Sequence, residues 1–234
     1  MSLAQPADAS DTPVEARLRT SRSSPLRLAI ARPERRGHPP AMAGHALVST
    51  VMSRLIHLNG PPGIGKSTLA RRYVDEHPGV LNCDVDVLRA LIGGWQTDFA
   101  GAGALIRPAA LAMIEAYLRS GNDVVLPQML MNPIELARFE KAATNAGAQF
   151  IERMLMDTPS ASVARFHRRG RSEPADPWHE QVRTIVEAEG GDAMLAATHA
   201  ALERLLVERP TALVVTTVDG EIEKTYRALI ETLG

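Results

Sequence analysis

Short apolar runs alternate with longer amphipathic segments from residue 54 onward. Runs rich in Val, Ile and Leu predict strands, and longer segments with apolar residues three and four positions apart predict helices. Strands are expected at 54–59, 79–83, 122–127, 149–156 and 211–216. Helices are expected at 66–77, 85–92, 104–120, 133–146, 159–170, 178–189, 192–208 and 220–233. Alternating strands and helices favour an α/β domain, in which helices cover both faces of a parallel sheet.

Three predicted helices carry a start signal of a capping residue followed by proline. These pairs are Asn132-Pro133, Thr158-Pro159 and Asp176-Pro177. The side chain of the first residue can accept a hydrogen bond from the first helical turn, and proline suits the first helical position. The signals support the boundaries drawn from periodicity.

The first fifty residues differ from the rest in composition. Residues 1–50 contain seven arginines and no lysine, with many Ser, Pro and Ala residues and no sustained apolar periodicity. Such a segment lacks the apolar groups needed to build a core. We therefore predict a disordered tail over 1–51 and one folded domain over 52–234.

Composition excludes few classes of protein, but it bears on the expected partners and on the cellular compartment. The chain has 234 residues, of which 45% are hydrophobic and 23% charged, and its formal net charge is -1. This balance gives no sign of a nucleic-acid partner. The single cysteine, Cys83, rules out an internal disulfide and fits a reducing cytoplasm. We found no apolar run approaching the length of a membrane span, so we expect a cytoplasmic protein.

Residues 60–67 read Gly-Pro-Pro-Gly-Ile-Gly-Lys-Ser, a complete G-x-x-x-x-G-K-[ST] phosphate loop between a predicted strand and helix. Glycines allow the tight turn that points N–H groups at an anion, and the helix N-terminus adds positive charge. Lys66 is expected to reach the outer phosphates of a nucleotide, and the Ser67 hydroxyl to ligate Mg²⁺. The expected nucleotide-binding residues are Gly60, Gly63, Ile64, Gly65, Lys66, Ser67 and Thr68.

The second predicted strand ends in two carboxylates, Asp84 and Asp86, followed by Arg89. Ligands of open α/β sheets bind beyond the carboxyl ends of the strands, so these residues are expected near the γ-phosphate. One carboxylate can accept a proton from an attacking hydroxyl, and Arg89 can hold an acceptor phosphate or the transferring group. Alternatively, a carboxylate only caps the next helix and Arg89 is a surface charge.

The run from Gly60 to Arg89 resembles a group of small P-loop kinases that includes polynucleotide 5′-kinases, zeta toxins and chloramphenicol phosphotransferase-like enzymes. The resemblance covers most of residues 53–234. It implies a P-loop NTPase fold with five parallel strands in the order 2-3-1-4-5 and an arginine-rich lid. By position in the group's motif, Asp86 takes the role of catalytic base and Arg89 orients the acceptor.

The third strand departs from this group. It leads into Pro127-Gln128, where relatives commonly place an aspartate followed by Thr-Asn. Either Asp84 replaces that metal-organising carboxylate, or Gln128 contacts the substrate or a metal-bound water. The candidate metal ligands are therefore Ser67 and Asp84.

A basic segment follows the fourth strand, with four arginines in residues 165–171. Small P-loop kinases use such a lid to bring arginines onto the phosphates. Helical spacing favours Arg165 and Arg169 for this role. The alternative is a basic helix end that complements the helix dipole.

The glycine-rich segment 93–103 is expected to be a loop over the acceptor pocket. Trp95 could then stack on a ring of the substrate. Equally, Trp95 or Phe99 could fill the local core.

These features together predict an ATP- and Mg²⁺-dependent kinase that phosphorylates a hydroxyl of an unidentified small molecule or nucleotide-like acceptor. The alternative is an ATP-hydrolysing switch whose acceptor is water. A nucleic-acid end kinase would need a basic groove, which the sequence does not indicate beyond 165–171. Nothing in the sequence resembles a zinc site, a Ser-His-Asp triad or a dinucleotide fingerprint.

Overall fold

Five parallel strands form one sheet in the order β2-β3-β1-β4-β5. The computed structural model describes residues 52–172 and 176–234, so the tail predicted over 1–51 lies outside the described residues. The fold class and the strand order are confirmed. The strands are β1 (Arg54–Asn59), β2 (Leu81–Asn82), β3 (Val124–Leu126), β4 (Gln149–Met156) and β5 (Leu213–Thr216).

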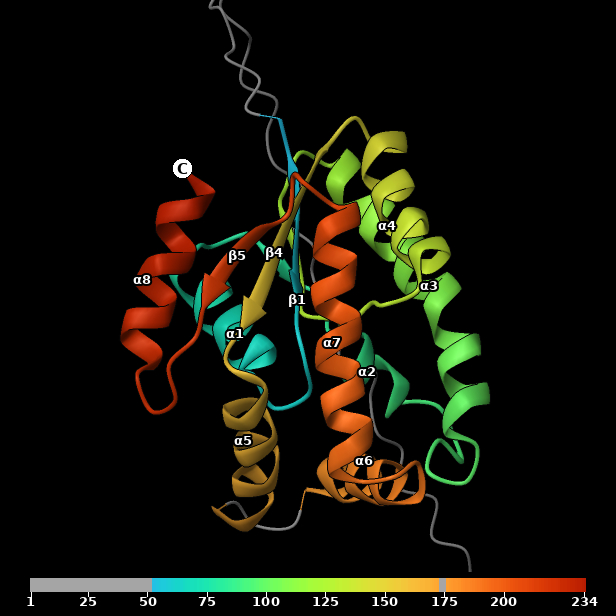
Figure 1. Cartoon of the computed structure of the whole chain (residues 1–234). Helices are drawn as coiled ribbons and strands as arrows, with labels where there is room; N and C mark the ends of the chain where they lie inside the picture. Colours follow the sequence, from blue (N-terminus) through green and yellow to red (C-terminus); the bar gives the residue numbers. More distant parts are fainter. Residues whose placement is uncertain (1–51, 173–175) are drawn as a thin grey trace, which may run out of the picture. The chain divides into compact units, whose positions relative to one another are not determined.

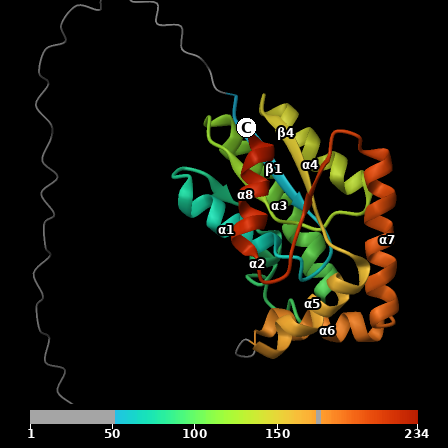
Figure 2. The same cartoon turned by 60° about the vertical axis from the view of Figure 1, so that its left-hand side comes forward.

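Helices cover both faces of the sheet (Figure 1). On one face lie α3 (Phe99–Arg119), α4 (Pro133–Asn145) and α7 (Asp192–Glu208), and on the other lie α1 (Lys66–Glu76) and α8 (Ile222–Leu233). A short helix, α2 (Val85–Arg89), follows β2. Figure 2, turned by 60°, shows α7 and α8 on opposite sides of β4.

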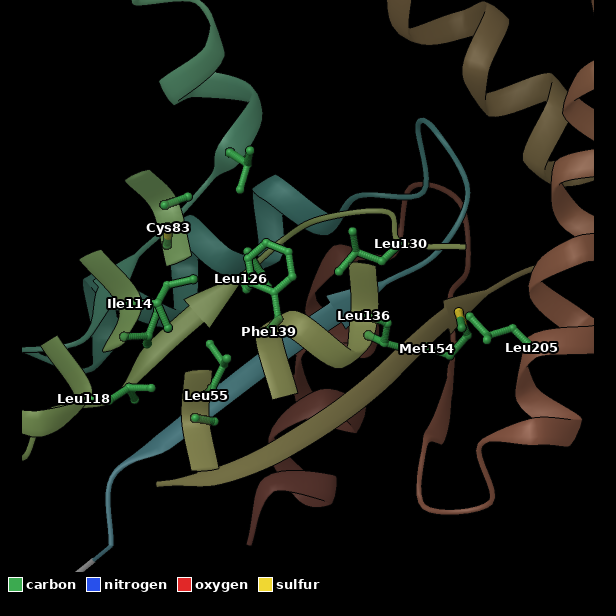
Figure 3. Close-up of a cluster of buried hydrophobic side chains, with 14 of the residues drawn as sticks. Leu55, Cys83, Ile114, Leu118, Leu126, Leu130, Leu136, Phe139, Met154 and Leu205 are labelled. Carbon is green, nitrogen blue, oxygen red and sulfur yellow. The ribbon is translucent and has the colours of Figure 1, made fainter. Parts of the chain in front are cut away.

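The larger core lies between the sheet and α3, α4 and α7. Alternate residues of each strand point to opposite faces, so Leu55 enters this core while Ile56 enters the core beneath α1 and α8. Figure 3 shows Phe139 of α4 among side chains from the strands and from α3. Phe139 is 1% exposed, and its ring fills the space between these layers.

Helices α5 (Pro159–Ser172) and α6 (Pro177–Ala188) lie beyond the carboxyl ends of the strands (Figure 1). A small core holds them to the start of α7 and contains Phe166 of α5, Val186 of α6 and Leu195 of α7. The Asp176 side chain accepts a hydrogen bond from the backbone N–H of Trp178, as the cap-plus-proline signal predicted. These two helices therefore lie at the end of the sheet where the phosphate loop also follows β1.

Helix α3 begins five residues before its predicted start. The segment 93–103 was predicted to be a loop, but α3 already begins at Phe99. The Asp98 side chain accepts a hydrogen bond from the N–H of Gly101 and caps the helix. Gly101 and Gly103 have low helix propensity, so they hid the first turn from the sequence pattern.

Helix α3 also has the length and hydropathy of a membrane span. It has 21 residues and an 18-residue window of mean hydropathy 1.3. The prediction that no apolar run approaches spanning length was therefore wrong, because alanines on every side of the helix raise its hydropathy. Length and composition alone are weak support for a membrane segment, and Ala110, Ile114 and Leu118 pack against the sheet.

A set of buried polar side chains links β1, β4 and the residues that follow β3. His57 on β1 is 0% exposed, and its Nε2 lies 2.8 Å from the carbonyl oxygen of Gln128. Its Nδ1 lies 3.7 Å from Glu152 Oε1 on β4, and Arg209 Nε donates to Glu152 Oε2 at 2.7 Å. Burial alone would raise the pKa of Glu152, but His57 and then Arg209 outweigh it and hold that pKa below its ordinary value. The group fixes the backbone that follows β3.

The packing of α4 predicts a large loss of stability on truncating Phe139. Phe139→Ala removes a fully buried ring and leaves a cavity, so we expect the free energy of unfolding to fall by about 3–5 kcal/mol. Ile134→Ala on the same helix is the matched control, because Ile134 is 68% exposed, and should change stability by less than about 0.5 kcal/mol. Urea unfolding of both variants measures the difference, and equal losses would contradict the described packing.

Candidate active site

The phosphate loop joins β1 to α1, and two of its glycines approach other backbone segments closely. A Cβ on Gly60 would lie 2.5 Å from the carbonyl oxygen of Leu155, and one on Gly63 would lie 3.1 Å from Cα of Phe166. Gly60, Gly63 and Gly65 also have φ values of 143°, 78° and 106°, which L side chains rarely adopt. Glycine is therefore required here by contact as well as by conformation.

Lys66 begins α1, and its ammonium group lies against the loop. Its Nζ donates hydrogen bonds to the carbonyl oxygens of Gly60 and Pro61 at 2.8 and 2.9 Å. Burial lowers the pKa of Lys66 to about 8; Asp86 and Asp84 oppose this shift, and Arg169 adds to it. Lys66 is thus a cation held among two carboxylates and another cation.

The remaining loop residues divide between packing and lining roles. Ile64 is 3% exposed and packs in the core beneath α1 and α8, so only its backbone is available to a nucleotide. Two hollows adjoin the loop. Lys66 and Ser67 line the larger one, called the larger cavity below. Thr68 is exposed and borders the other, called the second hollow. The roles of these residues in nucleotide binding remain predictions.

Asp84 and Asp86 follow β2 and line the same cavity as Lys66. Asp84 is buried, and its Oδ1 accepts hydrogen bonds from the N–H groups of Asp86 and Val87 at 3.1 and 3.4 Å. Asp84 thus caps α2, and because it also lines the cavity, its additional role as a metal ligand stays a prediction. The Asp86 side chain keeps 34% of its surface accessible within the cavity. Because Asp86 is more accessible from the cavity than the buried Asp84, Asp86 is better placed to accept a proton.

The surroundings of Asp86 raise its pKa. Burial and the neighbouring charge of Asp84 favour the protonated form, while Arg89, Lys66 and the Gln128 side chain favour the carboxylate. A base with a raised pKa accepts a proton more readily than an ordinary aspartate.

Arg89 is not a surface charge, which was one of the two sequence alternatives. It is 5% exposed, with Nη2 3.8 Å from Asp86 Oδ1. Its Cζ lies 4.1 Å from the ring centre of Phe99 and 5.4 Å from that of Trp178. Arg89 therefore lies in the cavity wall beside Asp86.

Gln128 follows β3 and lines the cavity next to Asp86. Its backbone is held by His57. Its Oε1 is buried, with no hydrogen-bond partner among the described residues. Gln128 therefore offers an acceptor atom at the position where the related kinases carry a carboxylate.

Arg165 lies away from this cavity, in the wall of the second hollow. It is 8% exposed, donates to the carbonyl oxygen of Ile64 and to Thr217 Oγ1, and lies 3.1 Å from Asp157 and 3.4 Å from Asp219. Its contacts tie α5 to the phosphate loop and to the end of β5. A phosphate contact from Arg165, as the lid pattern predicted, remains a prediction.

Arg169 is placed differently from Arg165. It lines both the larger cavity and the second hollow, together with Gly63 and Gly65. Its charge is close enough to Lys66 to lower the pKa of the lysine. Of the two candidate lid arginines, Arg169 is the one that lines the larger cavity together with Lys66.

The larger cavity has a volume of about 630 Å³ and the second hollow about 470 Å³. The loop and the end of β2 form one side of the larger cavity, and α5 and α6 form the other. Several cavity residues had no sequence signal that singled them out. They are Arg107, Trp178, His179, Val182 and Arg183. Only the cap at Asp176 indicated where α6 begins, and no local pattern showed that it faces the loop.

Trp95 was predicted either to stack on the substrate or to fill the core. It is half-buried and stacks on Trp178, with ring centres 5.4 Å apart. Phe99 lines the cavity, whereas Trp95 is outside the set of described residues that line it. Trp95 therefore packs against Trp178, which itself lines the cavity.

The donors at the loop fit Mg²⁺ in the manner of nucleotide sites. Mg²⁺ in such sites takes one or two protein oxygens and completes its shell with water and phosphate. Ser67 and Asp84 line the same cavity and offer such a pair. Within residues 52–172 and 176–234 there is no group of three His, Cys, Asp or Glu side chains that could hold a metal. A metal here would depend on phosphate oxygens.

A sequence model described as an AAA domain matches residues 55–209. The chain belongs to this family. The match spans the strands from β1 to β4, the phosphate loop and helices α1 to α7. No curated protein matches the chain.

Solved structures share this fold at low sequence identity. The tunicamycin resistance protein of Deinococcus radiodurans aligns with a TM-score of 0.53 and 16% identity over 78% of this chain and 96% of its own. A protein of Chloroflexus aurantiacus described as a candidate kinase gives 0.52 and 17% over 78% and 96%. A gluconokinase of Sinorhizobium meliloti gives 0.47 and 17% over 77% and 94%. The family match and the first two alignments together show that this chain has the P-loop kinase-like fold.

The lowered pKa of Lys66 predicts how ATP binding depends on pH. With a pKa of about 8, the amine is protonated before binding below pH 8 and must take up a proton above it. ATP affinity should fall above pH 8, by up to about tenfold per pH unit. Isothermal titration at increasing pH measures this fall.

Lys66→Arg is the control for that titration, because a guanidinium stays charged throughout the range. Its affinity profile should be flat above pH 8. A wild-type profile as flat as that of Lys66→Arg would contradict the combination of a lowered pKa at Lys66 and its contact with the phosphates.

Proposed function

We propose that this AAA domain protein is a kinase that transfers the γ-phosphoryl group of ATP to a hydroxyl of a small molecule. One observation carries the proposal: Lys66 of the phosphate loop and Asp86 line one cavity. A phosphate-binding cation and a base of raised pKa are the two groups that this reaction needs. The shared fold of the family supports nucleotide binding. The lining of the larger cavity supports the proposed chemistry of the acceptor.

The second hollow suits the nucleoside of ATP. It lies beside the loop, bordered by Thr68, Val218 and Gly220, and it shares Gly63, Gly65 and Arg169 with the larger cavity. The phosphate chain would then cross the loop, with its γ-phosphate toward Asp86. Backbone N–H groups, Lys66 and the N-terminus of α1 would bind the phosphates.

The acceptor hydroxyl would approach from the larger cavity. Its oxygen forms the new bond to the γ-phosphorus while the bond from that phosphorus to the bridging oxygen of ADP breaks. The hydroxyl proton goes to Asp86, and ADP leaves with the negative charge. When bound, Mg²⁺ held by Ser67 and Asp84 would neutralise the phosphate charge. Arg89 and Arg169 would complement the charge of the transferring group.

The lining of the larger cavity indicates an acceptor with an apolar body. Helix α6 presents Trp178, Val182 and Val186 to the cavity, and Met129 and Leu91 line the opposite side. A hydroxyl compound with an aromatic or branched apolar group would cover this surface. We therefore expect aryl glycosides to be better acceptors than the free sugars. The proposal sets the reaction in the cytoplasm, where the lone thiol of Cys83 stays reduced.

An ATP-hydrolysing switch is the second candidate, because β3 is followed by Pro127 and Gln128 and not by a carboxylate. In that case water, not a hydroxyl compound, would take the phosphoryl group. The discriminating measurement is the rate of ADP release with and without hydroxyl compounds. A rate that no compound raises, with inorganic phosphate as the sole product, would favour the switch.

Asp86→Asn and Asp84→Asn test the two carboxylate roles. Asp86→Asn keeps size but removes basicity, so phosphoryl transfer should fall at least about 100-fold with ATP affinity nearly unchanged. Asp84→Asn retains the helix cap, since asparagine caps as well as aspartate, but should raise the Mg²⁺ concentration needed for half-maximal rate. ATP affinity and transfer rate are measured for both variants across a magnesium titration. Full transfer by Asp86→Asn together with loss in Asp84→Asn would assign the base to Asp84.

A further inference from the structure

Arg89 is an enclosed cation with few polar contacts. Its Nη2 lies 3.8 Å from Asp86 Oδ1, beyond hydrogen-bond distance, and its buried Nε has no hydrogen-bond partner among the described residues. Burial accordingly lowers the pKa of Arg89. Buried charges are normally hydrogen-bonded. Other contacts must therefore set the position of this side chain.

The surface of α3 provides the first of these contacts. Phe99 and Gly103 lie one turn apart on this helix, and the guanidinium of Arg89 rests on both. The Phe99 ring centre is 4.1 Å from Cζ of Arg89. A Cβ added to Gly103 would lie 3.1 Å from Nη2 and 3.2 Å from both Cζ and Nε. A Cβ at position 103 would therefore press on the guanidinium, which would have to move by a few tenths of an ångström.

Trp178 of α6 provides the second contact. Its ring centre is 5.4 Å from Cζ of Arg89, and the ring packs on Trp95 at 5.4 Å and on Phe99 at 5.3 Å. Its backbone is fixed by the hydrogen bond to Asp176. Cation–π contacts strengthen when the cation is removed from water. The indole therefore closes the side of Arg89 that α3 leaves uncovered.

We propose that Trp178 is a positioning residue that holds Arg89 beside Asp86 for phosphoryl transfer, and that Gly103 is glycine because the guanidinium lies against it. The inference rests on the proposed function for its catalytic consequence. When water is the acceptor, Trp178 acts only through Arg89, so removing the indole matters only while Arg89 is present.

The two positions allow a test that separates positioning from folding. Alanine in place of glycine inside a helix ordinarily favours the helix. Gly103→Ala should therefore leave the protein folded while it displaces Arg89. Gly93→Ala is the matched control, because no atom lies within 4 Å of a Cβ at Gly93. Trp178→Phe keeps an aromatic ring and should recover most of what Trp178→Ala loses.

The kinetic arm measures ADP formation by the full chain from MgATP, with water as the acceptor. Trp178→Ala and Gly103→Ala should each lower kcat by about tenfold or more and change KM for ATP by less than about twofold. Gly93→Ala should match the wild type. In an Arg89→Lys background, Trp178→Ala should have almost no further effect. An undiminished effect of Trp178→Ala in that background would overturn the proposal.

The spectroscopic arm is independent of turnover. The NMR signal of Arg89 Nε–H, assigned by its loss in Arg89→Lys, should be shifted by the two rings and protected from exchange with water. Trp178→Ala and Gly103→Ala should move the signal toward that of free arginine, whereas Gly93→Ala should leave it in place. A signal unchanged in both variants would overturn the positioning role. If the wild type formed no ADP either from water or in the presence of any hydroxyl compound tested, the proposed function would be overturned, and the NMR signal would then decide the position of Arg89 by itself.

Discussion

Close backbone contact at two glycines holds the phosphate loop in its place at the edge of the sheet. Gly60 lies against the carbonyl oxygen of Leu155 on β4, and Gly63 against the backbone of Phe166 on α5. Any Cβ at Gly60 would strike an atom that cannot move without breaking the sheet. These contacts fix the loop between β4 and α5. They also bring Lys66 to the cavity lined by Asp86.

Electrostatic balance then decides what the cavity can bind. Lys66, Arg89 and Arg169 bring positive charge to the wall, and Asp84 and Asp86 oppose it. Burial works against three of these charges: it lowers the pKa of Lys66 and of Arg89 and raises the pKa of Asp86. The N–H groups of the loop add positive potential to that of the cations, so the wall suits the phosphates of the proposed nucleotide. The wall formed by α6 presents apolar side chains, which suit the apolar body of the proposed acceptor.

The sequence predicted the sheet well because its signals are local. The strands β1 and β4 match their predicted bounds, and α7 does so at both ends. The start of α3 was missed, since Gly103 weakens a helix locally and its purpose lies in a contact with Arg89. Tertiary contact overrides propensity at such a position.

The candidate site was predictable where a motif has a fixed geometry, and not where packing decides. The loop and the end of β2 share one edge of the sheet in any fold of this order, so Lys66 and Asp86 could be brought together from the sequence. Arg165 and Arg169 are one turn apart on α5 and looked equivalent. Only the fold shows that Arg165 is engaged by Asp157 and Asp219 while Arg169 reaches the cavity. Trp178 had no signal, since its partners come from α2 and α3.

Turnover of ATP by Lys66→Ala tests the central claim most directly. The claim is that Lys66 meets the phosphates of ATP in the loop and that Asp86 acts in the same cavity. Removing the ammonium should lower ADP formation by at least about 100-fold, while circular dichroism shows a folded protein that melts near the wild-type temperature. Unchanged turnover in the folded variant would contradict the account.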